Sequence, residues 1–220
     1  MNFYFSDDTM KKKQLEMFLQ QVPDFSKPKP FLEQYQTPAT IASEVLFFAY
    51  QYQDIQDRIV VDLGCGTGIF SVGSAMLGAK KVIGIDTDAD CISVAKIFAN
   101  SHNLNNITFI SEDVSDSVFS ADTVIMNPPF GAQKGNIHAD QVFLKKAIQN
   151  ADVVYSLHLT KTLPHLKRFA QSLDAEIEIL TTFNFPIKGQ FEFHKKLREN
   201  VSVSCLRFVH SSAEKEEACK

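Results

Sequence analysis

The residues best suited to chemistry form an Asn-Pro-Pro-Phe element at positions 127–130, directly after the apolar stretch 121–126. The side chain of Asn127 carries a carbonyl acceptor, and the two prolines fix the backbone, so the Pro128 carbonyl points in one direction. Phe130 adds a flat apolar face. Two acceptors beside a ring suit a planar –NH₂ group with a conjugated lone pair, such as adenine N6 or a carboxamide. The candidate catalytic residues are therefore Asn127, Pro128, Pro129 and Phe130.

A glycine-rich loop is the second candidate element. Residues 60–69 read Val-Val-Asp-Leu-Gly-Cys-Gly-Thr-Gly-Ile, an apolar strand that runs into G-x-G-x-G. Glycine permits positive φ and close approach of a ligand, and the following helix presents its N-terminal amides to that ligand. The dinucleotide fingerprint, G-x-G-x-x-G, has a different spacing. The loop residues expected to bind a cofactor are Gly64, Cys65, Gly66 and Gly68.

Three acidic residues stand at the ends of successive predicted strands: Asp62, Asp86 and Asp113. A carboxylate at Asp62, just before the first glycine, would repel a pyrophosphate but tolerate a positively charged ligand. Asp86 lies roughly 20 residues beyond the loop, where an acid binds ribose hydroxyls in a doubly wound sheet. Asp113 can accept a hydrogen bond from the exocyclic amine of an adenine. With no phosphate-binding Lys in the loop, these acids predict a site for S-adenosylmethionine (SAM).

The order of the predicted elements indicates an α/β fold. Short apolar strands alternate with helices, which is typical of a mostly parallel sheet covered on both faces. The predicted strands are 58–63, 81–86, 107–111, 121–126, 152–157, 175–185 and 201–209. The predicted helices between them are 70–77, 89–102, 139–149 and 161–172. The carboxyl ends of such strands form the usual ligand-binding edge.

Two helices precede the sheet in this interpretation. The first ends before Pro23, and the second begins with Thr37 as its cap and Pro38 in its first turn. Between them, Lys27–Pro30 reads as a stiff extended linker. We expect residues 1–52 to form a helical extension covering the cofactor site, 53–210 the methyltransferase domain and 211–220 a flexible tail.

The composition excludes several classes of protein. A chain of 220 residues with 45% hydrophobic and 22% charged residues suits one soluble domain. The longest clean apolar run, residues 45–50, is too short to span a bilayer, and the N-terminus shows no secretory signal. The cysteines are not at zinc-finger or C-x-x-C spacing, so we expect no metal site and a reducing cytoplasm. They are Cys65, Cys91, Cys205 and Cys219.

Several stretches together resemble a known family. The chain is similar over about residues 31–209 to the small-subunit ribosomal RNA N6-adenine methyltransferases of the methyltransferase-like protein 5 type and their archaeal relatives. The Asn-Pro-Pro-Phe motif alone is shared widely, whereas Glu-Gln-Tyr, Tyr-Ser-Leu-His and Phe-His-Lys-Lys together are much more specific. The matching stretches are Leu32-Glu-Gln-Tyr-Gln-Thr-Pro38, Asp62-Leu-Gly-Cys-Gly66, Ala75-Met-Leu-Gly-Ala79, Thr123-Val-Ile-Met-Asn-Pro-Pro-Phe-Gly131, Tyr155-Ser-Leu-His158 and Phe193-His-Lys-Lys196.

The resemblance implies a Rossmann-like class I methyltransferase with a mostly parallel, seven-stranded sheet. It implies methyl transfer from SAM to the N6 amino group of an adenine in small-subunit ribosomal RNA. By the same resemblance, Gln34 and Thr37 reach over bound SAM. Asp86 and Asp113 hold its ribose and adenine. Asn127 and Phe130 take the target base, and Asn127 also contacts SAM. Eukaryotic members of the family work with a small zinc-finger activator subunit that adds to an edge of the sheet.

The positive charge of the chain is concentrated near its end. The net charge is −4, from 22 basic and 26 acidic residues, which does not by itself indicate a nucleic-acid binder. Residues 186–198, however, are rich in basic side chains and include Phe191 and Phe193. Phosphate contacts beside stacking rings would suit RNA, although a solvated face is the simpler alternative. The candidate RNA-binding residues are Lys188, His194, Lys195, Lys196 and Arg198.

Other functions fit parts of the pattern. A glutamine-amide methyltransferase acting on protein would need the same two acceptors, but it gives no reason for the basic stretch. A DNA adenine methyltransferase is disfavoured because the sequence shows no target-recognition domain. A SAM-binding scaffold without activity would not need the Asn-Pro-Pro-Phe element. The sequence therefore favours RNA adenine methylation and leaves these alternatives to experiment.

Overall fold

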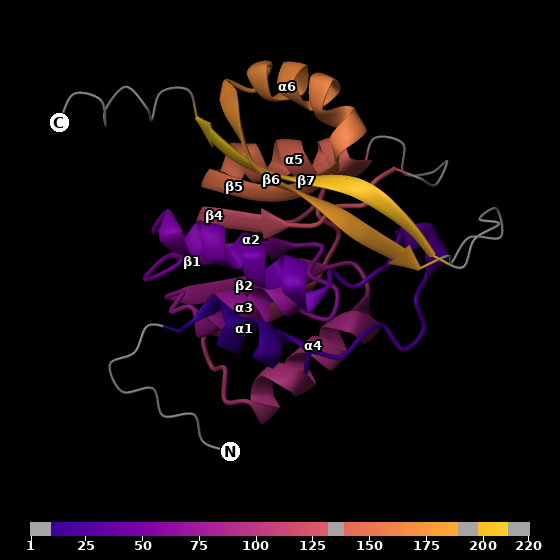
Figure 1. The fold of residues 1–220 in the computed structure, drawn as a ribbon. Helices are drawn as coiled ribbons and strands as arrows, with labels where there is room; N and C mark the ends of the chain where they lie inside the picture. Colours follow the sequence, from indigo (N-terminus) through magenta and orange to yellow (C-terminus); the bar gives the residue numbers. More distant parts are fainter. Residues whose placement is uncertain (1–9, 132–138, 189–197, 211–220) are drawn as a thin grey trace.

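The computed structural model describes residues 10–131, 139–188 and 198–210, and it contains one seven-stranded sheet with helices on both faces (Figure 1). The helices are α1 (Lys12–Leu19), α2 (Ala39–Gln51), α3 (Ile69–Met76), α4 (Ala89–Ser101), α5 (Ala139–Asn150) and α6 (Leu163–Gln171). The strands are β1 (Ile59–Leu63), β2 (Lys81–Asp86), β3 (Ile107–Ser111), β4 (Ala121–Met126), β5 (Ala151–Leu159), β6 (Ala175–Lys188) and β7 (Arg198–His210). Short 3₁₀ turns cover Pro30–Leu32 and Thr160–Thr162.

The strand order is β3-β2-β1-β4-β5-β7-β6. Strands β1 to β5 pair in parallel, whereas β7 pairs antiparallel with both β5 and β6. The order reverses between β1 and β4, so the loops that follow these two strands diverge around a crevice at the carboxyl edge, the usual ligand site of such sheets. The predicted α/β class with a mostly parallel sheet is confirmed.

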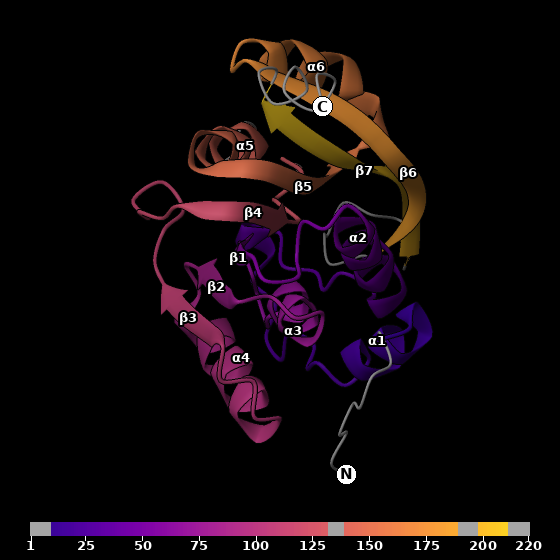
Figure 2. The same cartoon turned by 90° about the vertical axis from the view of Figure 1, so that its left-hand side faces the viewer.

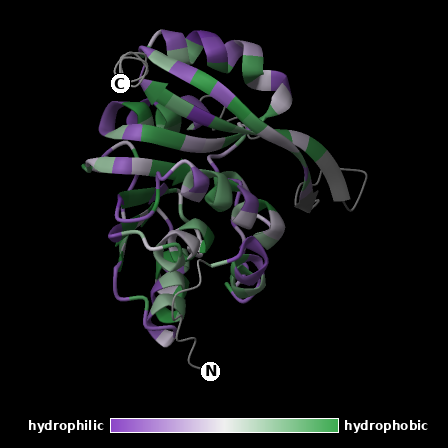
Figure 3. Ribbon diagram, turned by 60° about the vertical axis from the view of Figure 1, so that its left-hand side comes forward, coloured by the Kyte–Doolittle hydropathy of each residue, from purple (hydrophilic) through white to green (hydrophobic). Residues whose placement is uncertain are grey.

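Each face of the sheet has its own apolar core, because successive strand side chains point to opposite sides. On one face, Val60, Val82 and Ile125 belong to the buried cluster that also contains residues of α1, α2 and α3. On the other face, Val61 and Val124 pack with residues of α5 and α6. Figure 2 shows these two helical layers on opposite sides of the sheet, and Figure 3 shows hydrophobic colouring along the central strands.

The N-terminal helices are part of the first of these cores. Leu15 and Leu19 of α1 are buried, and so are Val45 and Leu46 of α2. Helix α2 begins at Ala39 with Pro38 at the cap position, one residue later than a Thr37 cap would place it, and no side chain caps it. The prediction that Thr37 caps this helix is therefore wrong, because its hydroxyl is used elsewhere.

The β6–β7 hairpin is longer than the sequence indicated. Strand β5 pairs with β7 only as far as Leu159↔Val203, whereas the pairing of β6 with β7 continues to Lys188↔Arg198. The hairpin therefore extends beyond the carboxyl end of β5 as a two-stranded arm (Figures 1 and 3). The predicted basic stretch begins and ends on this arm, and its central part lies outside the described residues.

Within the described ranges, no helix combines the length and apolar character needed to cross a membrane.

Candidate active site

A cavity of about 700 Å³ opens at the carboxyl edge of the sheet, within the usual range of about 300–1,000 Å³ for ligand pockets. Walls from the N-terminal segment, the glycine loop, the ends of β2, β3 and β4, and helix α5 enclose it. Of the predicted cofactor and catalytic residues, those lining the cavity are Gln34, Gly64, Gly66, Asp86, Asp113, Asn127 and Pro129. Those outside the lining are Thr37, Asp62, Cys65, Gly68, Pro128 and Phe130.

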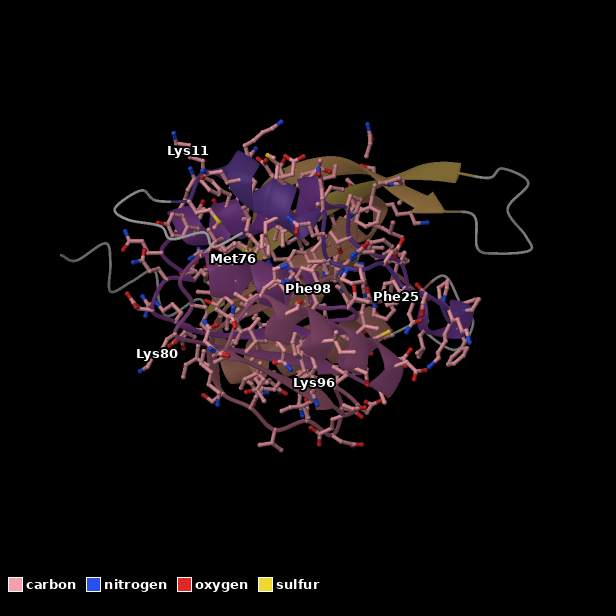
Figure 4. The ribbon with its side chains drawn as sticks, turned by 90° about the horizontal axis from the view of Figure 1, so that it is seen from below. Lys11, Phe25, Met76, Lys80, Lys96 and Phe98 are labelled. Carbon is pink, nitrogen blue, oxygen red and sulfur yellow. The ribbon has the colours of Figure 1, made fainter. Side chains whose placement is uncertain are left out.

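The glycine loop forms the floor of the cavity. Gly64 and Gly66 have positive φ of 69° and 54°, which favours glycine on backbone grounds. A Cβ added at Gly66 would lie 2.8 Å from the ring of Phe25, and one at Gly64 would lie 2.9 Å from the ring of Phe143. Two aromatic rings therefore pack directly onto this loop. In Figure 4, Phe25 lies on the side toward which the β6–β7 arm extends, opposite Lys80.

Asp86, at the end of β2, is tied to the loop through its carboxylate. Its Oδ2 accepts from the backbone N–H of Gly66 at 2.8 Å, and its Oδ1 accepts from that of Asp88 at 2.8 Å. Burial raises the pKa of Asp86, and these two N–H donors partly offset that effect. A carboxylate oxygen can accept a second hydrogen bond, so the group is fixed in place and can still receive two ribose hydroxyls.

Asp113 lies beyond β3 on a more open part of the cavity wall. Its Oδ1 accepts from the backbone N–H of Ser115 at 2.8 Å and from the Ser115 hydroxyl at 2.6 Å. These two bonds hold the pKa of Asp113 below its usual range. The carboxylate is therefore charged at neutral pH and held at the rim of the cavity, where it can accept a hydrogen bond from an amine.

Asp62 occupies a different position from the other two acids. Its side chain is buried in β1, where Oδ2 accepts from the N–H of Ser71 at 2.8 Å and from the hydroxyl at 2.6 Å. It ties β1 to α3 beneath the loop and does not line the cavity. Burial raises the pKa of Asp62 to about 7, although the two bonds from Ser71 lower it and nearby Asp86 raises it further.

We predict that Asp62 makes the stability of the protein depend on pH. Because its pKa is raised from 3.8 to about 7 on folding, the folded chain keeps a proton that the unfolded chain loses. The stabilisation is complete below about pH 4 and is lost as the pH rises to about 7. Urea unfolding of the wild type and of Asp62→Asn between these pH values should show the advantage of the variant growing with pH. If the free energies of unfolding of the two proteins change equally across this pH range, the assignment to Asp62 is contradicted.

Cys65 and Gly68 serve packing in this structure. Cys65 is buried in a small cluster with Ile92 and Ala95 of α4, and burial raises the pKa of its thiol, so it is unsuited to nucleophilic chemistry. Gly68 precedes α3 with a φ of 91°, and a Cβ there would lie 3.1 Å from Phe109. Their assignment as cofactor contacts thus receives no support from the cavity lining.

Asn127, directly after β4, has its amide orientation set by the N-terminal segment. Its Nδ2 donates to the Oγ1 of Thr37 at 3.0 Å, and its Oδ1 is buried with no hydrogen-bond partner among the described residues. A buried acceptor without a partner is costly, so it marks a place where a ligand donor belongs. Thr37 is therefore a positioning residue for Asn127.

The segment between α1 and α2 is fastened across the cavity by one acid that the sequence did not single out. Asp88 accepts from the Nζ of Lys29 at 2.7 Å and from the Nε2 of Gln34 at 2.7 Å. Burial raises the pKa of Asp88, but these bonds outweigh it and lower the pKa to about 2. The Oε1 of Gln34 accepts from the backbone N–H of Lys29 at 2.8 Å. Gln34 thus uses its amide to hold this segment in place.

Three aromatic rings from separate parts of the chain meet beside Asn127. Phe130 lies 5.3 Å from the ring of Tyr35 and 6.1 Å from that of Phe185. Tyr35 also contacts Phe185 edge-on at 5.6 Å. Because Phe185 belongs to β6, the base of the hairpin arm reaches the Asn-Pro-Pro-Phe element.

Tyr155 and His158 of β5, which belong to one of the matching motifs, are structural. Tyr155 is fully buried and donates to Asp54 Oδ2 at 2.6 Å. Arg207 completes this network, its Nε lying 3.2 Å from the same oxygen. His158 is also buried, with Nε2 2.8 Å from the Ser156 hydroxyl, and burial lowers its pKa to about 3. Both residues therefore stabilise the sheet, and neither lines the cavity.

The predicted RNA-binding residues lie on or beyond the arm. Lys188 ends β6 and pairs with Arg198 of β7, at the carboxyl edge that holds the cavity. His194, Lys195 and Lys196 lie outside the described residues. In the part of the chain that the structure describes, no cluster of three or more potential metal ligands occurs.

The residues present fit the cofactor expected from the sequence. A floor of two glycines accepts a close-packed ligand, and acids stand at the ends of β2 and β3 at the places suited to ribose and adenine. No lysine or arginine lines the cavity among the described residues, so a phosphate has no charged partner there. This combination matches a nucleoside without phosphates.

Comparison with known proteins assigns the chain to a family. The family model of the methyltransferase small domain matches residues 39–153. The rRNA N6-adenosine-methyltransferase METTL5 of Danio rerio is 39% identical over 206 residues, which span 91% of this chain and 99% of the relative. The Drosophila melanogaster protein of the same name is 35% identical, over 90% of this chain and 96% of the relative.

A solved structure agrees with both relatives. A Pyrococcus horikoshii protein assigned to the RNA methyltransferases superposes with a TM-score of 0.85 and 38% identity, covering 91% of this chain and 98% of its own. Sequence and structure thus match over nearly the whole length. The chain belongs to the methyltransferase small domain family and, within it, to the rRNA N6-adenosine-methyltransferases.

Proposed function

We propose that this chain methylates the N6 amino group of an adenine in RNA, with SAM as the methyl donor and small-subunit ribosomal RNA as the substrate. The observation that carries the proposal is the Oδ1 of Asn127, a buried acceptor without a partner beside a cavity for a nucleoside. The amide is held by Thr37, so this acceptor is in place before any substrate arrives. Family membership favours adenine over a protein carboxamide as the group it receives.

In this proposal the cofactor lies on the floor formed by Gly64 and Gly66. Asp86 accepts from the ribose hydroxyls and Asp113 from the adenine amine. SAM supplies an electrophilic methyl group carried on a positively charged sulfur. Gln34 keeps its predicted place in the cavity wall, but it acts by fastening the N-terminal segment to Asp88.

The target adenine is held by the Asn-Pro-Pro-Phe element. Asn127 Oδ1 and the Pro128 carbonyl accept the two N6 hydrogens, which aims the nitrogen lone pair away from the ring plane. Phe130 supports the face of the base. The proton on N6 becomes acidic only as the methyl group is transferred and then passes to solvent water, so positioning and electrostatics suffice without a strong base.

We propose that the hairpin arm binds RNA through its basic stretch. Charge reversal of Lys195 and Lys196 to Glu should weaken RNA binding and lower the slope of log K against log salt by about one to two, since each lost phosphate contact removes roughly one unit. Fluorescence anisotropy between 50 mM and 200 mM salt measures this. Lys80→Glu/Lys81→Glu, an exposed pair at the start of β2, is the matched control. An unchanged slope for the arm variant would leave that stretch as a solvated face.

A small zinc-finger activator, expected by family resemblance, would need an exposed edge of the sheet. Strand β3 is an edge strand of the sheet. Apolar side chains are exposed near it: Ile110 on β3 is 38% exposed, Ile97 on α4 is 70% exposed, and Val118 in the loop between β3 and β4 is 95% exposed. We propose this edge as the activator surface. Ile97→Asp/Val118→Asp should abolish co-purification with such a subunit while leaving the SAM dissociation constant unchanged; retained co-purification would exclude the edge.

In this proposal the N-terminal extension, residues 1–52, covers the cofactor site and residues 53–210 carry the chemistry. Residues 211–220, expected from the sequence to be a tail, lie outside the described residues. We place the enzyme in the cytoplasm, where ribosomal RNA is accessible.

The proposal is tested with tritiated SAM and an extract from cells that lack the gene. Purified protein should label the RNA fraction, and digestion of that RNA should assign the label to the small-subunit species. Label in the protein fraction would instead favour the glutamine-amide alternative. SAM binding without any transfer, both alone and with a co-expressed zinc-finger subunit, would favour a scaffold.

A further inference from the structure

The hydroxyl of Tyr35 is the feature that the proposed mechanism leaves unexplained. It is buried and has no hydrogen-bond partner among the described residues, and Tyr35 lines the same cavity as Asn127. Buried polar groups are normally paired, and an unpaired one destabilises the fold. Phenylalanine would fill the same space without that cost.

The position of Tyr35 is fixed from both sides. Gln34, just before it, is bound to Asp88, and Thr37, shortly after it, is bound to Asn127. The ring is further held against Phe130 and Phe185. The hydroxyl therefore cannot easily swing toward water or another partner, and the chain holds it where a ligand can meet it.

The chemistry of this hydroxyl is that of a donor. Burial raises the pKa of Tyr35 well above its usual value, with a smaller contribution from Glu33, so the proton is kept at all working pH values. Asn127 Oδ1 is an acceptor without a partner on the same cavity. An acceptor and a donor beside one aromatic ring match the edge of adenine, where the N6 amine donates and the neighbouring ring nitrogens accept.

We propose that Tyr35 is a positioning residue for the target base, donating a hydrogen bond to a ring nitrogen of the adenine whose N6 is held by Asn127. This inference rests on the proposed function. Its consequence is that Tyr35 stabilises the base only when the base is in the cavity, so its effect falls on turnover. Overall RNA affinity, which phosphate contacts dominate, should be unaffected.

The test compares Tyr35→Phe with Tyr155→Phe, two tyrosines that differ in whether the hydroxyl has a hydrogen-bond partner. Tyr35 has an unpaired hydroxyl, whereas the Tyr155 hydroxyl is bound to Asp54 and Arg207. In Tyr35→Phe, kcat on small-subunit RNA from cells lacking the gene should fall about tenfold, the ratio expected for one lost hydrogen bond. The dissociation constants for SAM and RNA should stay within about twofold, and the melting temperature should stay equal or rise. In Tyr155→Phe, the melting temperature should fall and kcat of the folded enzyme should not.

Three results would overturn the inference: an unchanged kcat in Tyr35→Phe, a tenfold weaker SAM affinity that accounts for the loss, or a melting temperature lowered as in Tyr155→Phe. The wild type measured in parallel separates this inference from the proposed function. If the wild type methylates RNA and Tyr35→Phe does so equally well, only the role of Tyr35 fails. If neither wild type nor variant modifies RNA, even with a zinc-finger subunit present, both fail together.

Discussion

Replacing Asn127 by alanine should lower the turnover number about a hundredfold, the usual effect of removing one preorganised polar contact from a reaction site. In the proposed mechanism the Oδ1 of Asn127, a buried acceptor without a partner among the described residues, meets the N6 amine. Affinity for SAM should stay near the wild-type value because Asp86, Asp113 and the glycine loop remain. Steady-state methylation of RNA, combined with calorimetry of SAM binding, separates the two effects.

A matched control for this variant is Asn100→Ala, since Asn100 is exposed on α4 and does not line the cavity. It should keep full turnover. Turnover by Asn127→Ala within a few-fold of the wild type would rule out the assigned role of the amide. A loss of SAM affinity equal to the loss of turnover would make Asn127 a cofactor contact alone.

Asp86→Ala should weaken SAM binding about a hundredfold, because it removes a carboxylate that can accept two charge-assisted hydrogen bonds. The variant also releases the N–H groups of Gly66 and Asp88, which Asp86 now holds. The glycine loop that forms the cavity floor and the attachment of the N-terminal segment to Asp88 should therefore both become looser. Isothermal titration with SAM measures the dissociation constant directly.

Asp152→Ala serves as the control for that experiment, since Asp152 is exposed near the amino end of β5. If Asp86→Ala fails to fold, Asp86→Asn keeps one acceptor oxygen and should show a smaller loss. Unaltered SAM affinity in a folded Asp86 variant would mean that the ribose lies elsewhere.

The fold could be predicted from the sequence because its signals are local. Strands such as β3 and β4 coincide with apolar runs, and Gly78, with a φ of 84°, follows α3 as expected. The ends of β6 and β7 were missed since polar and basic residues continue the hairpin beyond the sheet. There β6 and β7 still pair with each other but have no further neighbouring strand, so the sequence lacks the hydrophobic alternation that would indicate a strand.

From the residues alone, cavity-lining positions could be predicted where they follow strands, whereas Gln34 was expected only from the family resemblance. Asn127, Asp86 and Asp113 lie at strand ends, so topology alone brings them to one edge. The fastening of the N-terminal segment could not be predicted, because Lys29 meets Asp88 across 59 positions of the chain. The role of Thr37 was misjudged for the same reason: its distant partner, Asn127, outweighs the local preference for a helix cap.

The most direct test of the central claim is mass spectrometry of nucleosides after reaction with SAM that carries a CD₃ group. Small-subunit RNA from cells lacking the gene should yield N6-(CD₃)-methyladenosine with the wild type, and about a hundredfold less with Asn127→Ala. The deuterated mark on another nucleoside, or equal yields from the two proteins, would contradict the account.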